Sequence, residues 1–224
     1  MNVITLASRK GGAGKSTLTA HLAACAHAGG CRSLVIDADP QGSVTLWHSL
    51  RGQGGPALQS ATRGIERAVT FAAVEGYEWV FIDTAPTTWV VVQEAIRAAT
   101  LVLIPARPGL FDLDSARETI AAARERGKPF AVVLNAAPAR REERDAPALA
   151  LARAALGADK IPVWSGQISQ RAAFALTLAA GASAWEAEPE SAAAAEIGHL
   201  WSAVVRSVEA VNAAYAAARG DQAA

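Results

Sequence analysis

The sequence predicts a three-layer α/β/α fold with a mostly parallel central sheet. Short apolar runs alternate with longer stretches of helical period, and runs that are apolar on both faces are typical of strands buried on both sides. A repeated strand–helix–strand order implies right-handed crossovers and a parallel sheet covered by helices. With 224 residues and 51% apolar content, the chain can bury one substantial core. A single domain over residues 1–219 is therefore expected, followed by a frayed tail at 220–224.

The expected elements follow from where apolar runs meet Gly, Pro, Asp or Asn. The predicted strands are residues 3–7, 33–36, 79–82, 100–104, 130–134 and 161–164. The stretches between and after them predict helices at about 15–28, 61–75, 88–98, 111–126, 145–156 and 168–179. Apolar residues recur at steps of three and four over residues 191–219, which predicts one long amphipathic helix. Residues 52–56 form the most loop-like internal segment.

Charge and cysteine content restrict the possible partners. The 21 Lys and Arg residues balance the 21 Asp and Glu residues, so any binding of nucleic acid depends on a local patch. Cys25 and Cys31 are too few for a disulfide framework. The first apolar run meets Arg9 and Lys10 at once, unlike a signal peptide, and no run approaches the roughly 20 apolar residues that span a bilayer. We expect a cytoplasmic protein with no membrane partner.

A glycine-rich segment between the first strand and the first helix predicts a phosphate-binding loop. Glycines let backbone N–H groups face an anion, and the start of a helix adds unpaired N–H groups and a favourable dipole. In this pattern Lys15 reaches the β- and γ-phosphates, Ser16 gives its hydroxyl to Mg²⁺ and Thr17 contacts the α-phosphate region. The expected phosphate-binding residues are Gly11, Gly12, Ala13, Gly14, Lys15, Ser16 and Thr17.

The loop departs from the general P-loop at one informative position. Arg9 stands where the general pattern has its first glycine, and Lys10 follows it. Residues 10–16 resemble the deviant Walker A motif of the ParA/MinD family, which belongs to the SIMIBI class of P-loop ATPases and has an additional lysine at the position of Lys10. The resemblance implies that Lys10 reaches across a dimer interface to the partner's nucleotide. A second cation near the phosphates would stabilise charge on the transferring oxygens and tie hydrolysis to dimerisation.

Two further motifs resemble the same family. Residues 37–42, Asp-Ala-Asp-Pro-Gln-Gly, are similar to its Asp-x-Asp-Pro-Gln-Gly motif. This implies that Asp39 orients or activates the attacking water and that Asp37 supports the magnesium site. Residues 79–84 form an apolar strand ending in Asp83, as in Walker B, and Asp83 would hold Mg²⁺ through water. Ala85 departs from the family's usual Asp-Thr-Pro-Pro, which leaves the shape of that loop open.

The resemblance extends over nearly the whole chain and is strongest to small plasmid-type ParA proteins that lack an N-terminal helix-turn-helix extension. It implies that Asn135, which ends a strand, meets the adenine. The segment 104–114 resembles a family region near the base and the dimer interface, with no role assigned to any one residue. Arg140, Arg141 and Arg171 match family positions that contact DNA non-specifically, although each taken alone also fits a solvated surface charge.

The function implied by the resemblance is an ATP-dependent dimerising switch. With ATP and Mg²⁺ as cofactors, a homodimer would bind non-specific nucleoid DNA and position a plasmid or chromosome. A ParB-like or other adaptor would stimulate slow hydrolysis by Lys10, Lys15 and Asp39. One alternative is a MinD-like switch at a membrane surface, and another is the positioning of protein cargo such as chemoreceptor clusters or carboxysomes. A metal-cluster relative is disfavoured because Cys25 and Cys31 lie in or just after the first helix.

Overall fold

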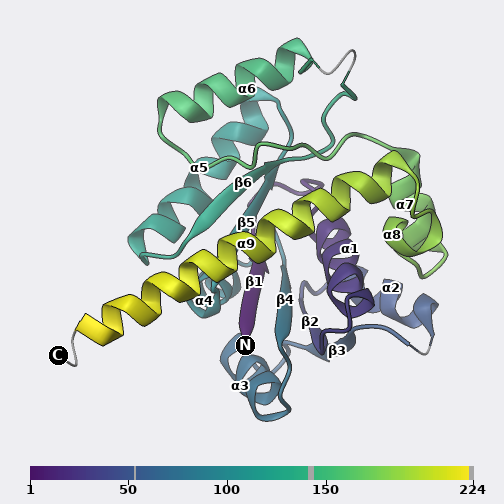
Figure 1. Ribbon diagram of the computed structural model, residues 1–224, viewed down its shortest axis with the longest axis vertical. Helices are drawn as coiled ribbons and strands as arrows, with labels where there is room; N and C mark the ends of the chain where they lie inside the picture. Colours follow the sequence, from purple (N-terminus) through teal and green to yellow (C-terminus); the bar gives the residue numbers. More distant parts are fainter. Residues whose placement is uncertain (53, 141–143, 222–224) are drawn as a thin grey trace.

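The described strands form one parallel sheet. The computed structural model describes residues 1–52, 54–140 and 144–221. Its sheet has the order β3-β2-β4-β1-β5-β6, and every neighbouring pair is parallel (Figure 1). The expected α/β/α fold class is confirmed. The strands are β1 (Asn2–Leu6), β2 (Ser33–Ala38), β3 (Ala57–Ser60), β4 (Trp79–Thr84), β5 (Leu101–Ala106) and β6 (Phe130–Leu134).

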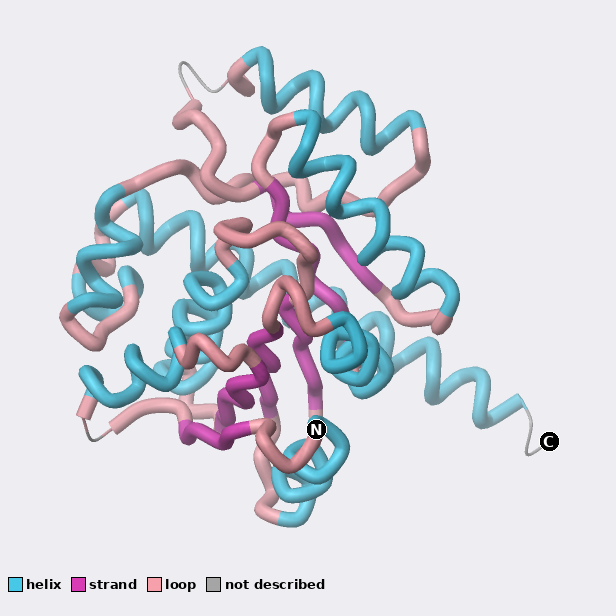
Figure 2. Tube along the Cα trace, turned by 180° about the vertical axis from the view of Figure 1, so that it is seen from behind, coloured by secondary structure: helices cyan, strands magenta, loops and turns pink. Residues whose placement is uncertain are grey.

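Helices cover both faces of the sheet. In Figures 1 and 2 one face carries α1, α7, α8 and α9, and the opposite face carries α3, α4, α5 and α6. The second helix, α2, packs on α1 and α7. The helices are α1 (Lys15–Ala28), α2 (Ser43–Arg51), α3 (Ile65–Val74), α4 (Trp89–Ala98), α5 (Leu110–Glu125), α6 (Pro147–Ala158), α7 (Ala172–Ala179), α8 (Ala184–Ala187) and α9 (Ala192–Asp221).

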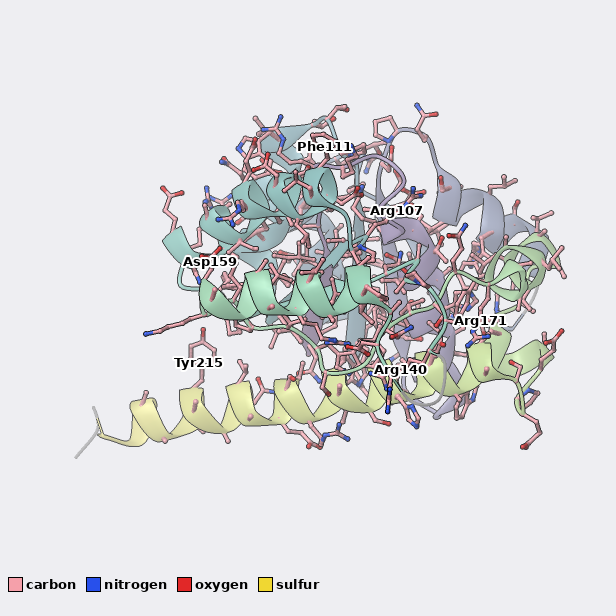
Figure 3. All side chains as sticks on the ribbon, turned by 90° about the horizontal axis from the view of Figure 1, so that it is seen from above. Arg107, Phe111, Arg140, Asp159, Arg171 and Tyr215 are labelled. Carbon is pink, nitrogen blue, oxygen red and sulfur yellow. The ribbon has the colours of Figure 1, made fainter. Side chains whose placement is uncertain are left out.

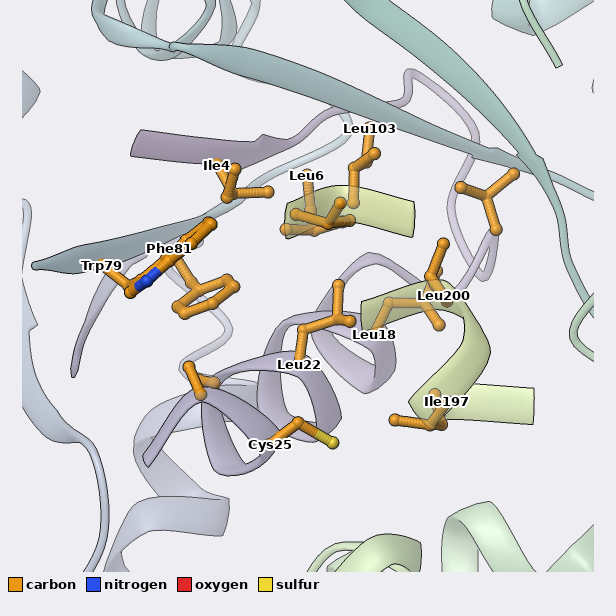
Figure 4. Close-up of a cluster of buried hydrophobic side chains, with 14 of the residues drawn as sticks. Ile4, Leu6, Leu18, Leu22, Cys25, Trp79, Phe81, Leu103, Ile197 and Leu200 are labelled. Carbon is orange, nitrogen blue, oxygen red and sulfur yellow. The ribbon is translucent and has the colours of Figure 1, made fainter. Parts of the chain in front are cut away.

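The central strand β1 divides the core into two halves. Ile4 and Leu6 pack with the residues of α1 and α9, whereas Val3 belongs to the cluster on the opposite face. Figure 4 shows the first cluster, in which the side chains of β1 and β4 meet those of α1 and α9. Such alternation on both faces buries every residue of β1 after Asn2. The strand is therefore held in place at the middle of the sheet.

The last helix, α9, runs across one face of the sheet and then beyond it (Figures 1 and 3). Ile197, Leu200, Val204 and Val208 are its large buried apolar residues toward the core. From there to Ala218, the last side chain that the structure describes in this helix, none is buried. Among the described residues, no helix has the length and apolar content that crossing a membrane requires.

Several expected boundaries were wrong, and each error has a local cause. Residues 161–164 do not form a strand but contribute one isolated bridge, Val132 to Val163, because Pro162 has no N–H to continue a ladder. The helix expected at 61–75 begins at Ile65, because Gly64 before it has φ 93° and ψ 149°, which is not helical. The helix expected at 168–179 begins at Ala172, because Ser169 pairs with Ala137 in a second bridge. The sequence analysis did not anticipate α2 and α8.

A buried histidine joins α1 to α8. The Nδ1 atom of His21 accepts a hydrogen bond from the backbone N–H of Ala184 at 3.2 Å, and its ring meets the ring of Phe174 edge-on at 5.3 Å between centroids. Burial lowers the pKa of His21 to about 4, against smaller opposing effects of the Phe174 backbone and the Glu186 carboxylate. The folded protein therefore holds this imidazole neutral.

This histidine should make the fold sensitive to acid. Folding depresses the pKa of His21 from about 6.5 to about 4. The neutral imidazole therefore contributes its full stability at pH values above about 6.5, and this stability is lost as the pH falls toward about 4. When the pH is lowered from about 7.5 to about 5, the unfolding free energy of the native protein should fall by about 2 kcal/mol more than that of the His21→Asn variant. Urea titrations of both proteins measure this difference, and parallel pH profiles would contradict it.

Candidate nucleotide-binding site

The loop between β1 and α1 has the shape of an anion cradle. Gly12 and Gly14 adopt φ angles of 71° and 98°, in the left-handed region that favours glycine. A Cβ atom at Gly14 would lie 2.0 Å from Nδ2 of Asn135. Gly14 is also the N-cap of α1 and supplies no side-chain cap, so the first N–H groups of that helix remain available to an anion.

Side chains from three places bind the carbonyl groups of this loop. The amide Nδ2 of Asn135 donates to the carbonyl of Ala13 at 2.6 Å, and Nη2 of Arg107 donates to the carbonyl of Gly12 at 2.9 Å. The ammonium of Lys15 donates to the carbonyl of Lys10 at 3.3 Å. These carbonyl groups are therefore paired without using the N–H groups of the loop.

The predicted phosphate-binding residues line one open groove of about 540 Å³. Asp39 and Gln41 lie on its wall, and the groove continues along α2 and α7, where Trp47 and Leu178 line it. Ala13 is buried and lies outside the lining. The lining residues from the loop and the start of α1 are Gly11, Gly12, Gly14, Lys15, Ser16 and Thr17.

Asp83 is fully buried at the end of β4. Its Oδ1 lies 3.5 Å from the hydroxyl of Thr19, and its Oδ2 has no hydrogen-bond partner among the described residues. Burial raises the pKa of Asp83 to about 7, while the nearby Ser16 hydroxyl and the charge of Lys15 act in the opposite direction. An unpaired buried carboxylate oxygen is costly, so this oxygen suits a cation or its bound water.

The donor set around Asp83 fits Mg²⁺. That ion keeps several waters and binds through one or two carboxylates together with phosphates, and Ser16 lines the groove beside the loop. Within the described part of the chain, no group of three His, Cys, Asp or Glu side chains could hold a metal ion. The protein would therefore supply a carboxylate and a hydroxyl rather than a complete metal cage.

Asp37 lies beside Asp83 in the register of β2 and β4, but its oxygens are already engaged. Oδ1 accepts from the backbone N–H of Asp39 at 3.1 Å, and Oδ2 accepts from the backbone N–H and the hydroxyl of Thr45 at 3.1 and 2.5 Å. Asp37 therefore closes the turn that carries Asp39 and leads into α2. Its predicted magnesium role stays a prediction.

The two lysines of the loop differ in environment. Lys15 is 5% exposed, and burial lowers its pKa although the carboxylates of Asp83 and Asp39 oppose this. Lys10 is exposed. The ammonium of Lys15 thus lies inside the groove, whereas the side chain of Lys10 is accessible to solvent or to another molecule.

Comparison with known proteins decides the family. The CobQ/CobB/MinD/ParA nucleotide binding domain matches residues 4–183. This chain belongs to that family. Protein ParA of Rhizobium radiobacter is 35% identical over 115 residues, which are 50% of this chain and 51% of that protein. The maintenance of carboxysome distribution protein A of Gloeobacter kilaueensis is 34% identical over 120 residues, 53% of this chain and 55% of that protein. The matches thus span about half the length of these curated relatives.

Solved structures share the fold of this ParA/MinD-family chain. MinD in the MinC:MinD cell division protein complex of Aquifex aeolicus has a TM-score of 0.73 at 18% identity, covering 92% of this chain and 96% of that chain. The septum site-determining protein MinD complexed with Mg-ADP from Pyrococcus horikoshii has a TM-score of 0.68 at 20% identity, covering 91% and 95%. At these identities the likeness concerns the fold.

Two of the three predicted DNA-contacting arginines come together in a second hollow of about 180 Å³. Arg140 pairs with Asp145 at 3.1 Å, and Arg171 pairs with Glu196 of α9 at 2.9 Å. In Figure 3 both arginines lie beside α9. Arg141 lies outside the described residues.

Two residues that touch the site were not predicted from the sequence. Thr45 is the partner of Asp37, and it lies in a helix, α2, that was not expected. Arg107 lies in the segment 104–114, to which no residue role was assigned, and it contacts the loop through Gly12. Their positions depend on strand order and on helix α2, so neither contact follows from sequence spacing.

Gly14 and Gly11 offer a matched pair of tests. We expect Gly14→Ala to lower the unfolding free energy by about 2–4 kcal/mol, because it strains the backbone and displaces the buried amide of Asn135. A Cβ atom at Gly11 meets nothing within 4 Å, so Gly11→Ala should change stability by less than about 1 kcal/mol. Urea denaturation compares the two, and equal losses would contradict the role of the Gly14–Asn135 contact.

Proposed function

We propose that this chain is an ATP-dependent dimerising switch that binds non-specific DNA in its ATP form. Its proposed task is to position a cargo, which is a plasmid or a chromosome. The observation that carries the proposal is the groove in which the buried Lys15 and the P-loop face Asp39, with Lys10 exposed beside it. A ParB-like or other adaptor would stimulate hydrolysis. The match to ParA of Rhizobium radiobacter supports this reading.

Each site residue has a chemical task in the proposed reaction. Lys15 binds the terminal phosphates, the N–H groups of the loop surround them, and Thr17 contacts the α-phosphate. Ser16 and Asp83 hold Mg²⁺, which neutralises phosphate charge when it is bound, and Asp37 keeps the neighbouring turn in place. Asp39 orients the attacking water from the facing wall of the groove. The amide of Asn135 donates to the loop, which leaves its Oδ1 to accept from the amino group of adenine.

Dimerisation is supported by the surface around the loop. Val90 on the first turn of α4 is 68% exposed, and Leu110 and Phe111 at the start of α5 are 77% and 76% exposed. Both helices begin at the carboxyl edge of the sheet, where the loop also lies. Exposed apolar residues at the same edge of the sheet as the exposed Lys10 suit a second copy that closes over the nucleotide.

DNA binding is supported by the hollow beside α9, where Arg140 and Arg171 gather with His199. Both arginines are paired with carboxylates, so phosphates must compete with Asp145 and Glu196 for them. A single copy should therefore bind weakly. Two copies in a dimer would double the number of phosphate contacts, with strong salt dependence. This affinity would make the ATP form nucleoid-associated.

A protein cargo is the second candidate, because the carboxysome distribution protein A of Gloeobacter kilaueensis is 34% identical over its match. The residues that bind the nucleotide would be unchanged, since cargo identity depends on the adaptor. A membrane surface suits the chain less well. Residues 211–218 at the end of α9, Val-Asn-Ala-Ala-Tyr-Ala-Ala-Ala, carry no basic side chain, whereas interfacial helices usually combine basic and bulky apolar residues.

DNA binding should require ATP and both copies. We expect gel shifts of a random-sequence duplex with ATP but not with ADP or without nucleotide. They should be lost in Lys10→Ala, kept in Asp39→Ala and weakened by salt. Arg171→Ala should weaken binding without changing ATP-dependent dimerisation. ATP-driven dimers that never shift DNA would leave the nucleotide site intact but overturn the nucleoid-based mechanism.

The exposed apolar residues Val90, Leu110 and Phe111 should be needed for dimerisation but not for nucleotide binding. Phe111→Glu places a charge on the exposed start of α5, so we expect at least a 10-fold weaker ATP-dependent dimer with nucleotide affinity unchanged within about threefold. Val74→Glu is a matched control at the end of α3, which leads into the amino end of β4 and so lies at the opposite edge of the sheet; this valine is 80% exposed. Sedimentation velocity with and without ATP measures both variants, and equal effects would contradict the assigned interface.

A further inference from the structure

Arg107 contacts the loop from outside every motif of the sequence. It follows β5 and stands between Ala106 and Pro108, and its Nη2 donates to the carbonyl of Gly12 at 2.9 Å. The residue is exposed, and Figure 3 labels it on the α5 side of the molecule, away from α9. Within the described part of the chain, its guanidinium meets this backbone carbonyl and no carboxylate. A surface arginine would ordinarily be expected to be solvated or paired with an acid.

The contact fixes the direction of one peptide group. In a trans peptide the carbonyl and the N–H point in opposite directions, so holding the Gly12 carbonyl outward turns the N–H of Ala13 inward. The neighbouring peptide is fixed in the same way, because Asn135 holds the carbonyl of Ala13 and the N–H of Gly14 is directed oppositely. Gly12 has φ 71°, a conformation that a glycine leaves easily without such a restraint.

The charge of Arg107 adds to this geometry. A hydrogen bond from a cation is shorter and stronger than one between neutral groups, and it polarises the peptide that accepts it. The N–H on the other side of that peptide becomes a better donor. The effect therefore reaches an anion that Arg107 itself does not touch.

We propose that Arg107 is a positioning residue for polyphosphate binding, which holds the Gly12–Ala13 peptide with its carbonyl outward and its N–H toward the bound phosphates. The inference rests on the proposed function for its ligand, a nucleoside triphosphate with Mg²⁺. It also makes a claim about the nucleotide-free chain, in which Arg107 restrains the loop before any phosphate arrives.

The test compares Arg107→Met with Arg107→Lys. Methionine keeps much of the length without an N–H donor, whereas lysine keeps the charge and an ammonium that can donate to the carbonyl. We expect the Kd for MgATP to rise about 10-fold in Arg107→Met, equivalent to about 1.4 kcal/mol, and by less than about threefold in Arg107→Lys. Both variants should unfold within about 2 °C of the native protein, because an exposed side chain away from the core contributes little to global stability.

A second measurement needs no nucleotide. Hydrogen–deuterium exchange of the peptide that contains residues 10–14 should be faster in nucleotide-free Arg107→Met than in the native chain and close to native in Arg107→Lys. An unchanged exchange rate, or equal MgATP affinity in the native protein and Arg107→Met, overturns the proposal. If the native chain binds no MgATP, the proposed function fails, and the exchange experiment still decides whether Arg107 restrains the loop.

Discussion

The site depends on one constraint in the loop after β1: its N–H groups must stay free for an anion while its carbonyl groups find hydrogen-bond donors elsewhere. N–H groups that face an anion leave carbonyl groups facing away, and these carbonyl groups need donors of their own. Asn135 and Lys15 supply two of these donors, and Arg107 supplies the third. The loop can therefore keep its shape before any ligand arrives.

The strand order brings the supporting residues to this loop. All strands are parallel, so their carboxyl ends meet at one edge of the sheet, where ligands bind in open α/β folds. The order β2-β4-β1-β5-β6 places Asp37 and Asp83 on one side of the loop and Arg107 and Asn135 on the other. The two acids thus lie apart from the donors that bind the carbonyl groups of the loop. Burial of Asp83 and Lys15 without a ligand is a cost that a bound Mg²⁺–phosphate group would offset.

The sequence supported the fold class and the place of the loop because both depend on local patterns. Buried parallel strands are apolar throughout, and a strand followed by Gly-Lys-Ser is a short-range signal. It did not predict β3, none of whose four residues is fully buried, nor the loss of a strand at Pro162. The contacts of Asn135 and Arg107 with the loop join residues 122 and 95 positions apart. Such contacts follow from the order of strands, which periodicity does not specify.

The two outer strands of the sheet are short, and this affects how the protein behaves at high concentration. An exposed strand edge is a template for pairing with other chains, and proteins limit this with short strands, prolines and covering segments. Here β3 has four residues and follows Pro56, while β6 is covered by the segment that bridges at Val163 and includes Pro162. Both edges are therefore poor templates for cross-strand aggregation, which limits the joining of sheets between copies of the chain even where many copies are close together.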